Sequence, residues 1–189
     1  MNPADVTACL VTRGNIDLRP ILDTLIFPNV VVWDNSVSPN CRTFGRYAAM
    51  IGAGEHCYLQ DDDVIVHPDA QWSLLNTHLP GQITTNYPEG LQPPIFDDLA
   101  FLGFGAIVDR SLVAPALAPF LNAHLHEEGF QTVGCDILLT MRSPVVRINA
   151  GYQLRPEAEG PGRSYRHPSF QKWKWTYYEL AKESLSAPA

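Results

Sequence analysis

The stretch that decides the fold is a short apolar run that ends in three adjacent acids, His56-Cys57-Tyr58-Leu59-Gln60-Asp61-Asp62-Asp63. Three neighbouring carboxylates repel one another and are costly near a core unless a positive charge joins them. If the run is a strand, Asp61 and Asp63 share one face and Asp62 points to the other. Two carboxylates at a strand end suit a hard divalent cation that keeps positions open for phosphate oxygens. The alternative is a solvated acidic turn.

Two further strands are expected before the acidic one. Residues 6–12 and 27–33 are rich in β-branched and apolar side chains, which predicts buried strands. One helix beginning near Asp17 and another over 43–54 separate these strands. This β-α-β-α-β order predicts a parallel sheet, whose ligands bind beyond the carboxyl ends of the strands. The residues expected at that edge are Thr12, Arg13, Asp34, Asn35 and the acids Asp61, Asp62 and Asp63.

The rest of the chain predicts more elements of the same kind. Strands are expected over 82–85, 101–108 and 145–148, and helices over 68–79, from Asp109 to about His126, over 135–141 and over 170–184. The Pro- and Gly-rich stretches 87–98 and 155–169 predict loops. The sequence therefore predicts a single α/β domain over 1–189, with a mostly parallel central sheet flanked by helices.

Composition excludes several classes of protein. The 189 residues are 46% hydrophobic and 17% charged, which is typical of a globular domain and not of a disordered chain. No apolar run reaches the length of a membrane span, and the first residues lack the basic and apolar pattern of a signal peptide. The four cysteines show no CxxC pairing, which favours a reducing, cytoplasmic setting.

The net charge of −7 is unevenly distributed along the chain. Residues 1–141 hold 5 Lys or Arg against 16 Asp or Glu, whereas residues 142–189 hold 8 against 4. A basic tail beside an acidic body suggests that an anion is bound near the C-terminus. A solvated helix face without a partner is the alternative.

Several short motifs follow one another in a recognisable order: Val11-Thr12, Val31-Val32-Trp33-Asp34-Asn35-Ser36, Gly45-Arg46-Tyr47-Ala48-Ala49, Ala53-Gly54 and Tyr58-Leu59-Gln60-Asp61-Asp62-Asp63. In order and spacing they resemble the GT-A-type glycosyltransferases of family 2, which carry an acidic DxD motif. The resemblance covers residues 6–63 and becomes looser afterwards. It implies a GT-A-like, Rossmann-related fold in which residues 1–66 bind a nucleotide-sugar and residues 67–189 form the acceptor side.

The resemblance also implies a role for individual residues. Thr12, Arg13, Asp34 and Asn35 would line the pocket of the nucleotide, and Gln60, Asp61 and Asp62 would contact the donor, most simply a UDP-sugar. Arg46 would reach the diphosphate, because a guanidinium matches phosphate oxygens, unless it is an ordinary surface arginine. Asp61 and Asp63 would hold Mn²⁺ or Mg²⁺. His167 is a further candidate ligand.

An inverting transfer also needs a base for the hydroxyl of the acceptor. Asp136 is the first candidate, and Asp97 and Asp98 are further ones. In the stretch Gly134-Cys135-Asp136 the family commonly has Glu where this chain has Cys135, and a helix N-terminal acid is the alternative for Asp136. The basic, aromatic tail suggests a hydroxymethylated DNA base as the acceptor.

Other interpretations remain open at this stage. A nucleotidyltransferase of related architecture is one, although Thr12-Arg13-Gly14-Asn15 has a single Gly where a phosphate loop would need more. A non-catalytic nucleotide-sugar-binding module is another. The chain is short for the class, so acceptor elements supplied by another subunit of an oligomer are also expected. The aromatic residues of the tail either stack on sugar or base faces or, as we favour, pack a C-terminal helix on the sheet; they are Trp173, Trp175, Tyr177 and Tyr178.

Overall fold

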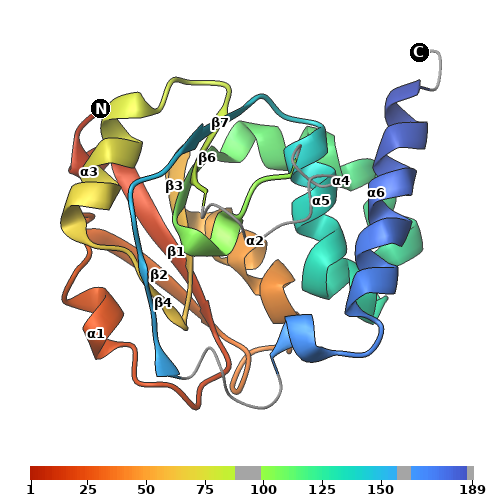
Figure 1. Cartoon of the computed structure of the whole chain (residues 1–189), viewed down its shortest axis with the longest axis horizontal. Coiled ribbons are helices and arrows are strands. Elements are labelled where there is room, and N and C mark those ends of the chain that lie inside the picture. Colours follow the sequence, from red (N-terminus) through yellow and green to blue (C-terminus); the bar gives the residue numbers. More distant parts are fainter. Residues whose placement is uncertain (88–98, 157–162, 187–189) are drawn as a thin grey trace.

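A six-stranded sheet with helices on both faces forms the body of the protein (Figure 1). The computed structural model describes residues 1–87, 99–156 and 163–186. Within them the strand order is β2-β1-β3-β6-β5-β7, and β6 is antiparallel to both of its neighbours while the other pairs are parallel. The strands are β1 (Val6–Thr12), β2 (Asn29–Asp34), β3 (His56–Asp61), β5 (Ile83–Asn86), β6 (Ala106–Asp109) and β7 (Val145–Ile148). The prediction of an α/β domain with a mostly parallel sheet is confirmed.

A small second sheet lies beside the main one. Its strands β4 (Val64–Ile65) and β8 (Gln153–Leu154) pair antiparallel directly after the acidic triplet. The backbone N–H of Arg155 then donates to the carbonyl of Asp63 at 2.9 Å. This pairing brings the basic tail of the chain to the end of β3.

The helices of the first half are shorter than predicted. α1 (Arg19–Leu22) is a single turn, and α2 (Gly45–Ala49) is flanked by two 3-10 turns, η2 (Arg42–Phe44) and η3 (Met50–Gly52). Gly45 explains how closely α2 packs on the sheet, because a Cβ at this position would lie 2.4 Å from the ring of Trp33. The segment 43–54 is therefore helical, but as three short pieces.

The prediction of a buried second strand is wrong for β2. In the described chain β2 pairs only with β1 and lies at the edge of the sheet. Val30 and Val32 are consequently exposed by about two fifths of their surface, 39% and 40%. An apolar run without alternation cannot distinguish a central strand from an edge strand, because the difference depends on which strand pairs beside it.

The helices of the second half occur close to where they are predicted. They are α3 (Pro68–Thr77), α4 (Arg110–His124), α5 (Cys135–Met141) and α6 (Phe170–Ser186). α4 continues through Pro115 and Pro119, whose side chains are exposed, so the backbone groups they leave unbonded are turned toward water. Asp109 occupies the N-cap position of α4 but does not cap it, because its carboxylate is bound elsewhere.

The core has two parts, one on each face of the sheet. β3 shows the division: Cys57 and Leu59 face α2, α4 and α5, whereas Tyr58 faces α3. α6 forms an outer layer on α5, at the right of Figure 1. The rings of Trp173 and Tyr177 lie directly on the backbone of two glycines, so these aromatic residues do pack the helix. They pack it on α5 and the π-helical turn η6 (Phe130–Gly134) where the sheet was expected, and Trp175 is exposed.

Candidate active site

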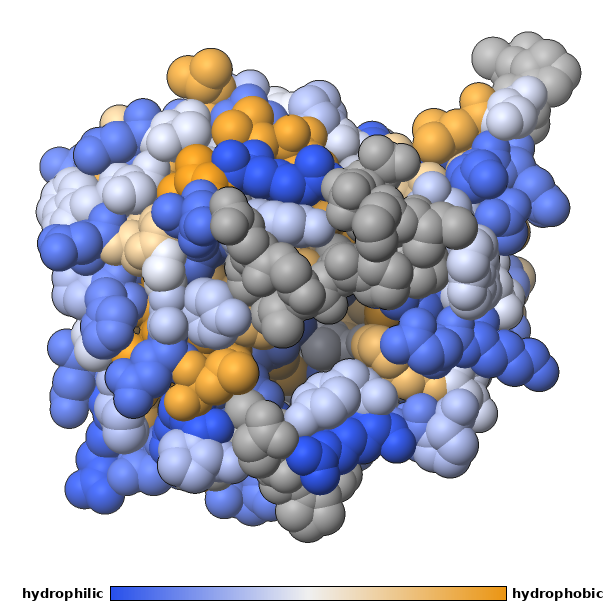
Figure 2. Space-filling view, in the orientation of Figure 1, coloured by the Kyte–Doolittle hydropathy of each residue, from blue (hydrophilic) through white to orange (hydrophobic). Residues whose placement is uncertain are grey.

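A cavity of about 760 Å³ lies at the carboxyl ends of β1, β2 and β3. A hollow is visible near the middle of the face shown in Figure 2. The size is within the range of small-molecule sites, roughly 300–1,000 Å³. One wall is apolar and comes from residues 99–104, just before β6. The predicted site residues that line the cavity are Thr12, Arg13, Asn35, Arg46, Asp61, Asp62, Asp63 and Asp136.

Arg46 joins two of the predicted site acids. Its Nη2 contacts Asp61 Oδ1 at 2.6 Å, and its Nη1 contacts Asp136 Oδ2 at 3.1 Å. The residue is 1% exposed, so it is not the surface helix arginine that the sequence allowed. Asp136 Oδ1 also accepts a 2.5 Å hydrogen bond from the hydroxyl of Tyr47. Arg46 and Tyr47, both from α2, therefore hold Asp136 in place. The sequence analysis gave Tyr47 no role of this kind.

The carboxyl of Asp61 titrates far above its ordinary range. Burial raises its pKa to about 6; Arg46 opposes this effect, and the nearby charges of Asp63 and Asp136 add to it. Its other oxygen, Oδ2, rests against the backbone of Gly103, where a Cβ would lie only 2.1 Å away. A carboxyl that titrates near neutral pH on a cavity wall is typical of functional sites.

The three acids do not divide as strand alternation predicts. β3 ends at Asp61, and Asp62 and Asp63 belong to the turn that follows. Asp62 is buried and accepts hydrogen bonds from the hydroxyl of Thr12 at 3.1 Å and the N–H of Arg13 at 3.2 Å. Both Asp62 and Asp63 contact Nη1 of Arg163, at 3.3 and 2.8 Å. Asp62 and Asp63 thus share the guanidinium of Arg163, whereas Asp61 forms its ion pair with Arg46.

Arg163 is a site residue that the sequence analysis did not single out. It comes from the segment 155–169, which was predicted only as a polar loop, and it lines the same cavity. Burial raises the pKa of Asp63, and the charge of Arg163 lowers it again in part. Arg155, which is also buried, donates to the carbonyl of Asp62 at 3.1 Å. The uneven distribution of charge was the one sequence signal for this contact, because buried arginines of a basic tail need acidic partners elsewhere in the chain.

The cavity is therefore not an acidic one. Its described lining carries four carboxylates, those of Asp61, Asp62, Asp63 and Asp136, and five basic side chains, those of Arg13, Arg42, Arg46, Arg163 and Lys174. Burial lowers the pKa of Lys174 to about 8, so the ammonium is retained at neutral pH at the expense of desolvation. This balance suits a ligand that brings its own negative charge.

Two predicted nucleotide-sugar residues, Gln60 and Asp34, are not part of the cavity lining, and a third, Asn35, has its amide already bound. Gln60 is buried inside the fold, where it accepts from the hydroxyl of Tyr58 at 2.6 Å and donates to the carbonyl of Val64 at 2.7 Å. Asp34 accepts from the N–H and the hydroxyl of Ser36 at 2.8 and 2.7 Å, the turn arrangement that a strand-end Asp commonly adopts. The amide of Asn35 lines the cavity but is bound to the backbone of residues 41 and 42.

His167 lies apart from the carboxylates to which it was assigned. It lines a neighbouring depression and not the main cavity, and its ring stacks on Trp173 with centroids 4.4 Å apart. Its Nδ1 accepts from the N–H of Ser169 at 3.1 Å. The further base candidates Asp97 and Asp98 are outside the described residues.

Asp61 and Asp63 offer carboxylate oxygens to the predicted cation. Carboxylate oxygens are what Mn²⁺ or Mg²⁺ prefers, and such ions are commonly held by one or two carboxylates, with phosphate oxygens and water completing the shell. Both acids lie on the cavity wall, so they fit this pattern provided that Arg163 moves away from Asp63. They do not form a complete protein cage with His167. Within the described chain, the one group of three metal-ligating atoms lying within 4.8 Å of one another is His56, His78 and Asp109.

Comparison with known proteins adds no assignment. No protein-family model matches the chain, and no curated protein is significantly similar to it.

The four cysteines, which all lie in the described part, are free thiols. Among the helices of the described residues, none combines the length and apolarity needed to cross a membrane.

Proposed function

We propose that the protein is a metal-dependent glycosyltransferase of the GT-A type, which moves a sugar from a nucleotide-diphosphate sugar to a hydroxyl group. The observation that carries the proposal is the cavity at the ends of β1, β2 and β3, which contains Asp61, Asp63 and Asp136 together. A parallel sheet binds ligands at this edge. The mixture of acids and arginines supports a ligand that combines phosphate with hydroxyl groups.

In this proposal the triplet and the arginines handle the pyrophosphate. Asp61 and Asp63 would hold Mn²⁺ or Mg²⁺, which stabilises the negative charge that develops on the departing diphosphate. Asp62 has a structural role, because its carboxylate fixes the turn after β1 through Thr12 and the N–H of Arg13. Arg163 occupies the acids in the free protein, and its guanidinium becomes available to phosphate oxygens when it leaves Asp63.

Asp136 is the proposed base of an inverting transfer. It would accept the proton of the acceptor hydroxyl as that oxygen bonds to the anomeric carbon and the bond to the diphosphate breaks. Oδ2 accepts one hydrogen bond, from Arg46, and retains a second lone pair, whereas Oδ1 accepts from Tyr47 and from the Cys135 thiol at 3.7 Å. Arg46 and Tyr47 together fix the orientation of the carboxylate.

The acceptor is left open in this proposal. A DNA acceptor was inferred from the basic tail, but Arg155, Arg163 and Lys174 of that tail are buried in or near the cavity. Their charge is directed inward, so the asymmetry of the sequence no longer argues for nucleic acid. The second candidate is a binding module without turnover, which the engagement of both Asp136 oxygens favours.

Binding and turnover can be tested in one series. We expect UDP-sugars or GDP-sugars to raise the melting temperature in the presence of Mn²⁺, and to do so less after Asp63→Ala, because one ligand of the cation is lost. Asp136→Asn should keep this shift and abolish donor hydrolysis and transfer. Asp69→Asn, an exposed acid in α3, is the matched control and should change neither.

The outcomes separate the candidates. A shift without hydrolysis or transfer in the wild-type protein would indicate the binding module. A shift with nucleoside triphosphates in place of nucleotide-sugars would indicate the nucleotidyltransferase. No shift with any of these ligands, or an equal shift in Asp63→Ala, would refute the assignment of this cavity to a nucleotide-sugar.

A further inference from the structure

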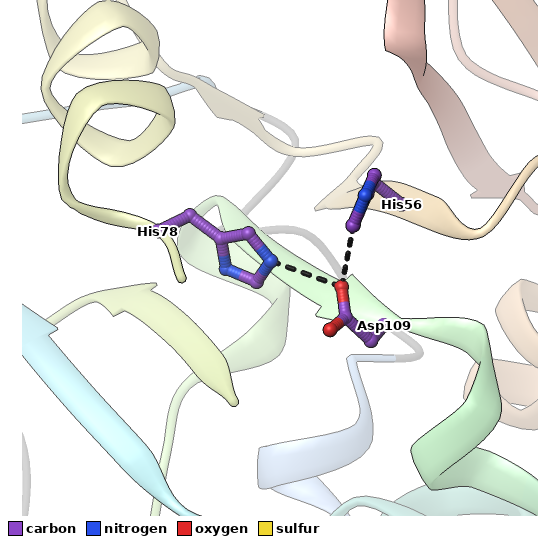
Figure 3. Close-up of side chains that lie close together, drawn as sticks. All are labelled: His56, His78 and Asp109. Atoms are coloured by element: carbon purple, nitrogen blue, oxygen red, sulfur yellow. Dashed lines mark hydrogen bonds and ion pairs between the residues drawn. The ribbon is translucent and has the colours of Figure 1, made fainter. Parts of the chain in front are cut away.

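A second group of titratable side chains lies at the opposite end of β3 from the acidic triplet. His56 is the first residue of β3, and Asp109 is the last residue of the neighbouring antiparallel strand β6, directly across from it. His78 comes immediately after α3. Figure 3 shows the three side chains converging from these three elements. The proposed glycosyl transfer makes no use of them.

The contacts centre on one carboxylate oxygen. His56 Nδ1 lies 2.6 Å and His78 Nε2 lies 3.0 Å from the same atom, Asp109 Oδ1. The side chains of His78 and Asp109 are 0% and 3% exposed, whereas that of His56 is 21% exposed. The group is therefore buried on two sides and open to water on the side of His56.

We infer that His56, His78 and Asp109 form a binding site for Zn²⁺. Two imidazole nitrogens and one carboxylate oxygen are ligands that Zn²⁺ accepts, and a fourth position is commonly left to water. In a tetrahedral site the donor atoms are about 3.3 Å apart, given metal–ligand distances near 2.0–2.1 Å. To reach about 3.3 Å, the 2.6 Å distance from His56 must lengthen by about 0.7 Å and the 3.0 Å distance from His78 by about 0.3 Å. His56, the more exposed of the two histidines, would make the larger movement.

The surroundings of the three side chains have the features of a metal site as well. The second ring nitrogen of His78, Nδ1, lies 3.1 Å from Thr84 Oγ1, and the second oxygen of Asp109, Oδ2, accepts the N–H of Gly81. Such outer hydrogen bonds fix the tautomer and the direction of metal ligands. They also leave Asp109 unavailable to cap α4, although it occupies the capping position. The carboxylate is thus held toward the two imidazoles.

Zinc alone is the probe for the experiment. The full chain, without an affinity tag that contains histidine, is stripped with a chelator and titrated with Zn²⁺ by calorimetry. We expect one equivalent to bind, and Co²⁺ in place of Zn²⁺ should give the visible spectrum of a tetrahedral nitrogen–oxygen site. His56→Gln should weaken zinc binding by more than about 100-fold, because loss of an outer hydrogen bond alone costs 10–100-fold.

Two control variants define where the zinc is bound. His126→Gln removes an exposed histidine elsewhere, and Asp69→Asn removes an exposed acid of α3; both should keep the full affinity. His78→Gln should behave as His56→Gln does, and circular dichroism checks that it folds. Absence of a stoichiometric site in the wild-type protein, or full affinity in a folded His56→Gln, would overturn the inference. The group would then be a hydrogen-bonded cluster in which two imidazoles donate to Asp109.

Discussion

The ionisable groups at the two ends of β3 are held in place by different kinds of partner. At the amino end, Asp109 is held by His56, which the sheet register places directly across from it, and by His78 and the N–H of Gly81 from the turn after α3. At the carboxyl end, Asp61 and Asp63 are balanced by arginines that come from α2 and from position 163. The first group depends on strand pairing, and the second depends on charge brought from distant parts of the chain. We therefore expect the loss of one charged partner to lower the free energy of unfolding more at the carboxyl end of β3 than at its amino end.

Removal of Arg46 should have the largest effect. Arg46→Met leaves the carboxylates of Asp61 and Asp136 facing each other without the buried cation between them. We expect a loss of about 3–5 kcal/mol in the free energy of unfolding, as for other broken buried ion pairs. Urea denaturation measures it. Arg19→Met is the control: both Arg19 and its partner Asp17 are exposed, so this variant should leave the urea midpoint nearly unchanged.

A triple variant sharpens this prediction. If charge is the cause, Arg46→Met combined with Asp61→Asn and Asp136→Asn should recover part of the lost stability, since no uncompensated carboxylate remains. No recovery would mean that the packing of the Arg46 side chain, and not its charge, stabilises this end of β3.

Loss of Arg163 should be the next largest effect. Arg163→Gln exposes Asp62 and Asp63 to each other, but Asp62 keeps its hydrogen bonds from Thr12 and from the N–H of Arg13. We therefore expect about 2–3 kcal/mol, less than for Arg46. Urea denaturation beside Arg166→Gln gives the comparison. An equal or larger loss than in Arg46→Met would contradict the ranking.

A methyl group at position 103 tests the close approach of Asp61 to the backbone. In Gly103→Ala the new Cβ would lie 2.1 Å from Asp61 Oδ2, so the carboxylate must move. We expect a loss of about 1–2 kcal/mol. Gly52→Ala is the matched control, because nothing lies within 4 Å of a Cβ there, and it should be neutral. Thermal unfolding of both variants decides the point; equal melting temperatures would show that Asp61 shifts without cost.

The pH dependence of stability should have opposite signs at the two ends. The pKa of Asp61 is about 6 in the folded chain against 3.8 ordinarily, so the unfolded chain loses its proton first and stability falls as pH rises between about 4 and 6. Burial acts to raise the pKa of Asp109, but hydrogen bonds from Gly81, His56 and His78 outweigh it and lower the pKa. Its contribution is therefore present above about pH 4 and lost on acidification.

Two variants separate these contributions. Relative to wild type, Asp61→Asn should gain stability as pH rises from about 4 to 6. Asp109→Asn should lose stability relative to wild type as pH rises toward about 4, and the difference should stay constant above that pH. Urea denaturation at a series of pH values measures both. Slopes of the same sign would show that the two ends of β3 do not differ in the way described.

The sequence predicts the order of the main-sheet strands and of the helices, because periodicity and Gly or Pro breaks are local signals; it does not predict the short strands β4 and β8. It also predicts that Thr12, Asn35 and the acids meet at one edge, since that follows from parallel strands. It cannot predict that Arg163 reaches Asp63, because nothing in a polar loop specifies where it returns. The group of His56 and Asp109 was missed for the same reason: the two residues are 53 positions apart and meet only through the antiparallel pairing of β6.

The contact of α6 with two glycines limits how the cavity can change. A Cβ at Gly129 would lie 2.6 Å from the ring of Trp173, and one at Gly134 would lie 2.7 Å from that of Tyr177. Any larger residue at either position would push α6 outward and carry Lys174, between the two rings, away from the cavity wall. Gly129 and Gly134 thus determine how close Lys174 lies to a ligand in the cavity, although neither glycine lines the cavity.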